Sequence, residues 1–137
     1  MNEKNQSKNT ANDNLIPHHI LLCLEGVKKG DYGFLKMLGE IYEEGRGVKL
    51  NKTKAIDFYQ KFYEEHRGRR VEVNEVELLM KIGHLYLELG NNYRAAEWYL
   101  KAGLQIIQDY PEKQQARIFK KYKVEKFLTK TGCQDKI

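Results

Sequence analysis

The chain has 137 residues, of which 41% are hydrophobic and 31% are charged, a composition that suits one domain with a modest core. No run of about 18 apolar residues occurs in it, which excludes a membrane-spanning helix, and two prolines in the whole chain argue against a loop-rich or all-β design. The net charge is +5, and all of it lies in residues 111–137, which hold eight basic and three acidic residues.

The chain is predicted to contain one domain between two polar ends. Residues 1–14 are rich in asparagine, and we expect a disordered tail there. A single helical domain is predicted over 15–131, followed by a flexible end at 132–137. Its first helix is expected over 15–29, where apolar residues recur at helical spacing.

The segment 30–66 is predicted to form two helices joined by a turn. The first, about 31–44, carries an apolar face at helical spacing. It is expected to end at Gly45 and Gly47, because glycine readily adopts the left-handed backbone that breaks a helix. Asn51 is then placed to cap the second helix.

The segment 74–109 predicts a second pair of helices. Asn74, followed three residues later by Glu77, is typical of a capping box at the start of a helix. Gly90 lies in the turn between the two helices.

A last, basic helix is predicted over 111–130, with Pro111 in its first turn. Outside residues 71–73, no stretch alternates convincingly with period two, as a half-buried strand would. The predicted fold class is therefore all-α.

The two helical pairs share a pattern of residues, as an internal repeat would. Small residues near the middle of each helix would let paired helices approach closely, so Gly39 is expected against Ala55, and Gly83 against Ala95. Aromatic rings would fill the wider gaps. The positions of the pattern are Leu38, Gly39, Tyr42, Gly45, Gly47, Ala55 and Tyr59 in the first pair, and Gly83, Tyr86, Ala95, Trp98, Tyr99 and Ala102 in the second.

The first pair resembles the Sel-one-like repeat (SLR) family, whose units follow the pattern LGxxYxxGxGVxxDxxKAxxWYxKA. Here Asn51 stands in place of the aspartate and Phe58 in place of the tryptophan. The second pair resembles the sister tetratricopeptide unit, without the GxGV insert and with Ile107 in place of the late proline. The resemblance implies an α/α superhelix, a solenoid of about six antiparallel helices, in which 15–29 and 111–130 cap the ends. It further implies a scaffold for protein–protein contacts without catalysis.

In the resembled family the first helix of each unit lines a concave groove. Carried over position by position, that face comprises Lys36, Glu40, Glu43, Glu44, Glu77, Met80, His84, Leu87 and Glu88. Five of these nine residues are glutamates, so we expect an acidic groove that receives a basic or mixed peptide segment, or a partner helix.

The sequence supports a catalytic function less well than it supports protein binding. His19 and Cys23 lie four residues apart on one helix and could pair a base with a thiol, but no third residue is evident beside them. The glutamates at 40, 43 and 44 could act in acid–base chemistry, but a cluster of surface glutamates is ordinary. We therefore predict a protein that is not an enzyme, with no catalytic residue, no metal site and no cofactor.

The sequence also suggests where the protein is found and the state of its cysteines. No secretory pattern is recognised, so a cytoplasmic protein is expected; secretion by a non-classical signal is the alternative. Cys23 and Cys133 would then be reduced thiols, with a bridge between them as the alternative.

The predicted function is a protein-interaction module that binds a partner protein or peptide. The alternatives are an immunity or inhibitor protein that neutralises one toxin or enzyme, and a secreted bacterial effector adaptor. An alternative of another class is a nucleic-acid-binding regulator that uses the basic helix at 111–130.

Overall fold

The computed structural model describes residues 15–66 and 74–132. Those residues form helices and no strands, which confirms the predicted all-α class. The helices are α2 (His18–Lys28), α3 (Gly33–Glu44), α4 (Lys52–His66), α5 (Glu75–Glu88), α6 (Asn92–Asp109), α7 (Glu112–Tyr122) and α8 (Val124–Thr131).

Three predictions fall wholly or mostly on residues outside the described part of the chain. They are the disordered tail at 1–14, the alternating pattern at 71–73 and the flexible end, of which residues 133–137 lie outside. Cys133 belongs to the same group. None of the described helices is both long enough and apolar enough to span a membrane.

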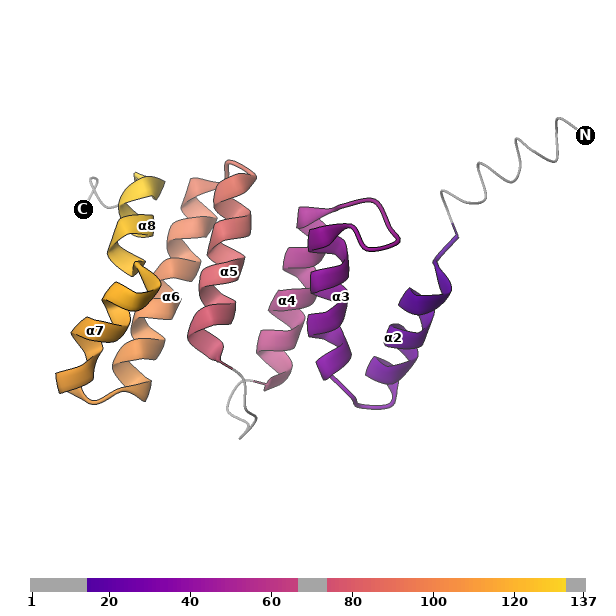
Figure 1. The fold of residues 1–137 in the computed structure, drawn as a ribbon, viewed down its shortest axis with the longest axis horizontal. Coiled ribbons are helices and arrows are strands. Elements are labelled where there is room, and N and C mark those ends of the chain that lie inside the picture. The colour runs from indigo at the N-terminus through magenta and orange to yellow at the C-terminus, as the bar shows by residue number, and fades with distance from the viewer. Residues whose placement is uncertain (1–14, 67–73, 133–137) are drawn as a thin grey trace, which may run out of the picture.

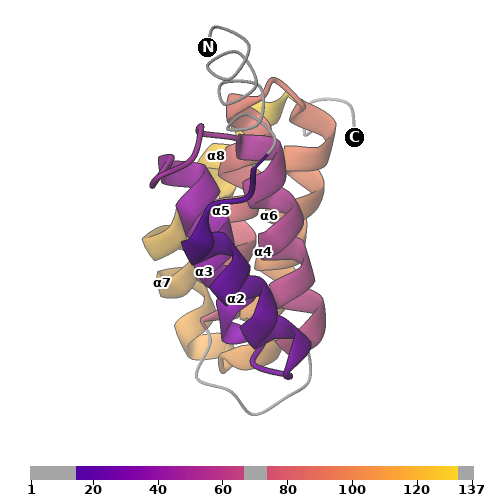
Figure 2. The ribbon, with the colours of Figure 1, turned by 90° about the vertical axis from the view of Figure 1, so that its right-hand side faces the viewer.

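The helices follow one another in a row from α2 at one end to α8 at the other (Figure 1). Each helix from α2 to α6 packs against the next, and α6 also packs against both α7 and α8. Seen along the row, α3 and α7 lie to the left and α4 and α6 to the right (Figure 2). Neighbours in sequence are therefore neighbours in space.

Two clusters of buried side chains hold the row together. The larger runs from α3 to α8 and includes the fully buried rings of Tyr59 and Tyr99. The smaller fills the space between α2 and α3, and its buried members are Ile20, Cys23, Leu38 and Ile41.

The predicted helix starts are confirmed at two positions. The side-chain oxygens of Asn51 and Asn74 accept hydrogen bonds from the backbone N–H groups three residues later, at 3.0 and 3.1 Å. Asn91 caps α6 in the same way. These bonds satisfy N–H groups that have no partner within their own helix. The predicted end of α3 is also confirmed, because Gly45 has φ 70° and Gly47 has φ 67°.

The single helix predicted over 111–130 is instead two helices, and the described residues hold seven helices in place of about six. The chain bends at Lys123, which has φ 56°. Ile118 and Val124 are both buried, yet residues six positions apart lie about 120° apart around a straight helix. The bend lets both helices pack against α6.

The side chain nearest to each of the two helical glycines is a tyrosine ring, which the sequence did not predict. A Cβ atom built on Gly39 would lie 2.6 Å from the ring of Tyr59, and one on Gly83 would lie 2.5 Å from the ring of Tyr99. No atom of Ala55 or Ala95 comes as near. In each pair a tyrosine ring lies on the glycine of the preceding helix, so the two pairs share the same contact as well as the same sequence pattern.

Candidate functional site

A pocket of about 320 Å³ is lined by residues of α3, α5 and α8. We call it the groove pocket, and its lining residues are Glu43 from α3, Lys81, His84, Leu85, Leu87 and Glu88 from α5, and Phe127 from α8. Four of the nine residues predicted for the concave face are among them: Glu43, His84, Leu87 and Glu88. The structure therefore brings together part of the predicted site.

The other five predicted residues lie elsewhere. Lys36, Glu44 and Glu77 are exposed and Glu40 is half-buried, but none of the four lines the groove pocket. Met80 is only 2% exposed and belongs to the core. The prediction that Met80 faces a partner is therefore wrong, because its side chain is used to pack α5 against its neighbours.

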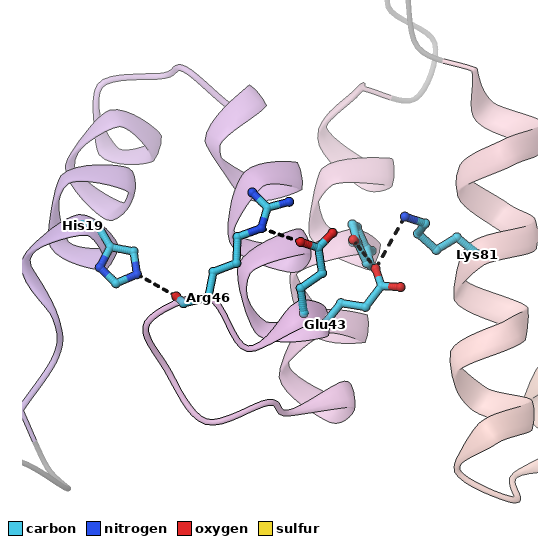
Figure 3. A network of polar contacts seen from close by, with 6 residues as sticks. His19, Glu43, Arg46 and Lys81 are labelled. Atoms are coloured by element: carbon cyan, nitrogen blue, oxygen red, sulfur yellow. Dashed lines mark hydrogen bonds and ion pairs between the residues drawn. The ribbon is translucent and has the colours of Figure 1, made fainter.

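The glutamates of the predicted face are largely paired with basic residues. Glu43 lies 3.5 Å from the Lys81 ammonium, and Glu88 lies 2.8 Å from the Lys52 ammonium. Glu44 pairs with Arg46. Figure 3 shows Lys81 reaching from its own helix toward Glu43. Three of the five glutamates thus have a nearby positive charge, so the expected acidic groove is a surface of mixed charge.

Glu43 has a second partner that anchors it. The hydroxyl of Tyr59 donates a hydrogen bond to its carboxylate at 2.6 Å. The ring of Tyr59 is fully buried; burial, followed by the hydrogen bond and charge of Glu43, raises the pKa of its hydroxyl far above the usual value. Tyr59 therefore stays protonated and holds Glu43 at the edge of the groove pocket.

His84 is held by a second buried tyrosine. Its Nδ1 lies 2.7 Å from the hydroxyl of Tyr99, and its ring packs edge-on against Phe127 with ring centres 4.3 Å apart. Burial lowers the pKa of His84, and the charge of Glu88 partly opposes this. The imidazole is therefore neutral at pH 7, and it presents an aromatic rather than a cationic surface to the pocket.

The candidate thiol and base on α2 have structural partners. His19 donates from Nε2 to the backbone oxygen of Arg46 at 3.0 Å, which ties α2 to the loop after α3 (Figure 3). Cys23 is buried beside Met37, and burial raises the pKa of its thiol. A thiol with a raised pKa is a poor nucleophile at neutral pH.

Four residues belong to the site but were not predicted for it: Lys52, Lys81, Leu85 and Phe127. Lys52 and Lys81 form the ion pairs, and Phe127 provides a wall of the groove pocket. The helical pattern alone places Lys81 three residues before His84 on the same face of α5, which could have identified it. Phe127 lies on α8, after the bend at Lys123, and no residue type at that bend marks it in the sequence.

The groove pocket therefore combines an apolar wall, a neutral imidazole and two ion pairs on the surface between three helices. In a comparison with known proteins, no family model, no curated protein and no solved structure matches the chain.

Proposed function

We propose that this chain is a non-enzymatic protein-interaction module that binds a segment of a partner protein in the groove pocket. The observation that carries the proposal is the meeting of Leu87 and Phe127 with ion-paired glutamates at one concave surface. Binding sites of this kind combine an apolar centre with a polar rim. The apolar wall supplies affinity and the charged rim orients the bound segment.

The shared contact of the two helical pairs supports a repeat architecture. Each pair seats a buried tyrosine on a glycine of the helix before it, Tyr59 on Gly39 and Tyr99 on Gly83. We propose that the pairs are repeats of the SLR and tetratricopeptide type, stacked as an antiparallel solenoid. Such an array presents a preformed surface, so a partner segment would bind without reordering the helices.

The charges of the groove pocket indicate the chemistry of the partner segment. Glu43 and Glu88 are each paired with a lysine from another helix, so the surface carries no large excess of either sign. The matching segment has a bulky apolar side chain flanked by charged residues of both signs. Because paired charges contribute little at the surface, the apolar contact would dominate the affinity.

The first test is a selection of short random peptides displayed on phage, followed by binding measurements with the purified peptides. We expect peptides that carry an apolar residue between charged residues and bind with a Kd of about 10–100 µM. Leu87→Ala, which shortens the apolar wall, should weaken binding about fivefold or more. Glu88→Lys, which reverses a charge of the rim beside Lys52, should weaken binding by a smaller but measurable factor.

Glu97→Lys is the matched control. Glu97 is also a glutamate in an ion pair, with Arg94 at 3.0 Å, but it lies on α6 outside the groove pocket. This variant should bind the selected peptides as tightly as the wild type. Peptides that bind all of these variants equally would contradict the groove assignment, as would a selection that yields no binder.

A further inference from the structure

A second pocket lies at the bend between α7 and α8, at the far end of the row from α2. Its volume is about 500 Å³. We call it the basic pocket, and its lining residues are Ala116, Phe119, Lys120, Lys123, Glu125 and Lys126. It shares no residue with the groove pocket, and the proposed function does not use it.

Three lysines and one glutamate surround this pocket, so its charge is strongly positive. It lies in the segment that carries the whole net charge of the chain. Within the part of the chain that the structure describes, Lys120, Lys123 and Lys126 form no ion pair. Three positive charges around one hollow repel one another, and their combined field attracts an anion.

The position of Lys123 is conformationally costly. It is the one non-glycine residue with a positive φ among those described, at 56°, and it ends α7 where glycine is the usual residue. A glycine would make the same bend without the steric cost of a side chain. A strained residue that carries a charge into a pocket points to a role for that charge.

The rest of the pocket is apolar. Phe119 is half-buried, and a Cβ atom on Gly103 of α6 would lie 3.3 Å from its ring, so α6 supports the ring from behind. Ala116, one turn earlier on α7, leaves room beside the ring because its side chain is a single methyl group. A ligand would therefore meet both an aromatic surface and ammonium groups.

We propose that the basic pocket binds a small organic polyphosphate, in which clustered phosphates contact the three lysines and an aromatic or apolar body lies against Phe119. Pockets of 300–1,000 Å³ hold ligands of this size. Clustered phosphates match three lysines around one hollow better than the carboxylates of an extended peptide, whose neighbouring residues lie about 3.3 Å apart and point to alternate sides.

The experiment uses the full chain and adenosine triphosphate without divalent cations as the probe, with titration calorimetry at two salt concentrations. We expect a Kd in the micromolar range that weakens as salt rises. Tripolyphosphate, which lacks the aromatic body, should bind less tightly, and adenosine, which lacks the phosphates, should not bind measurably.

Lys123→Gly separates a binding role from a structural one. Because glycine tolerates φ 56° better than lysine, the thermal unfolding midpoint should stay the same or rise, while affinity for the probe falls about fivefold or more. Glu125→Gln removes the negative charge of the pocket and should tighten binding. Lys113→Ala removes one charge from α7 outside the basic pocket and should leave the affinity within about twofold of the wild type.

Two results would overturn the proposal. One is an equal loss of affinity in Lys113→Ala and Lys123→Gly, which would show non-specific attraction to the basic segment. The other is tight binding of a single-stranded oligonucleotide with no measurable binding of the triphosphate, which would assign the lysines to a nucleic-acid surface. Because the groove pocket is separate, neither result bears on the peptide-binding experiment.

Discussion

Replacing Gly83 by alanine is expected to destabilise the fold by about 1–3 kcal/mol, although alanine is the better helix former by up to about 1 kcal/mol. The new Cβ would lie 2.5 Å from the ring of Tyr99, which is fully buried and cannot move into solvent. The overlap must be relieved by shifting α5 away from α6. Gly39→Ala should behave alike, because Tyr59 covers Gly39 at 2.6 Å.

Urea unfolding followed by circular dichroism measures this effect. Gly103→Ala is the matched control, since Gly103 also lies within a helix but its Cβ would come no closer than 3.3 Å to Phe119, a ring that is only half-buried. Its free energy of unfolding should stay within about 1 kcal/mol of the wild type. If Gly83→Ala proved neutral or stabilising, the tyrosine ring would not lie on the glycine as described.

The repeat pattern was predictable from the sequence, but the contact it serves was not. Glycines at 39 and 83 indicate a close approach of helices, and the natural expectation is a small residue opposite each. Ala55 and Ala95 are indeed buried. The space above each glycine is nevertheless filled by the tyrosine four positions after the alanine, because a flat ring can cover a stretch of backbone that has no side chain.

Local features were predicted better than distant ones. The caps at Asn51 and Asn74 depend on residues within one turn, so the sequence is sufficient to predict them. The bend at Lys123 has no such signal, because lysine is not a residue type that marks left-handed backbone. The apolar residues that spread around the supposed helix at 111–130 were the available evidence against a straight helix.

The candidate site was also predicted only in part: the residues of one helix face were predicted, and their partners from other helices were not. Glu43, His84, Leu87 and Glu88 lie on the predicted face, because a helical position determines which side a residue occupies. Their partners come from other helices, and only packing brings these together. The pairing of these glutamates with lysines from α4 and α5 was therefore not predicted, because it cannot be found by counting glutamates along one face.

A second expected result is a steep loss of stability at alkaline pH. The hydroxyls of Tyr59 and Tyr99 both have their pKa raised well above the usual value, in each case mainly by burial; the charges of Glu43 and Glu88, respectively, add to the shift. In the unfolded chain each would ionise near pH 10. Above that pH the unfolded state binds fewer protons than the folded state, so the free energy of unfolding falls by up to about 1.4 kcal/mol per pH unit for each tyrosine.

A fall in the free energy of unfolding above about pH 10 distinguishes the two buried tyrosines from ordinary surface residues. The stabilisation is complete below about pH 9 and is lost as pH rises above 10, which urea unfolding of the wild type and of Tyr59→Phe at pH 8 to 11 can follow. At pH 8 the variant should be less stable by about 1 kcal/mol, because it lacks the hydrogen bond to Glu43. This difference in free energy of unfolding should then close with rising pH, since phenylalanine has no proton to lose.

Tyr93→Phe is the control, at a position that is 75% exposed. Its free energy of unfolding should change with pH in parallel with that of the wild type. If the difference in free energy of unfolding between the wild type and Tyr59→Phe stayed constant with pH, the hydroxyl of Tyr59 would ionise as readily in the folded protein as in the unfolded chain. That result would contradict a buried hydroxyl that donates a hydrogen bond to Glu43.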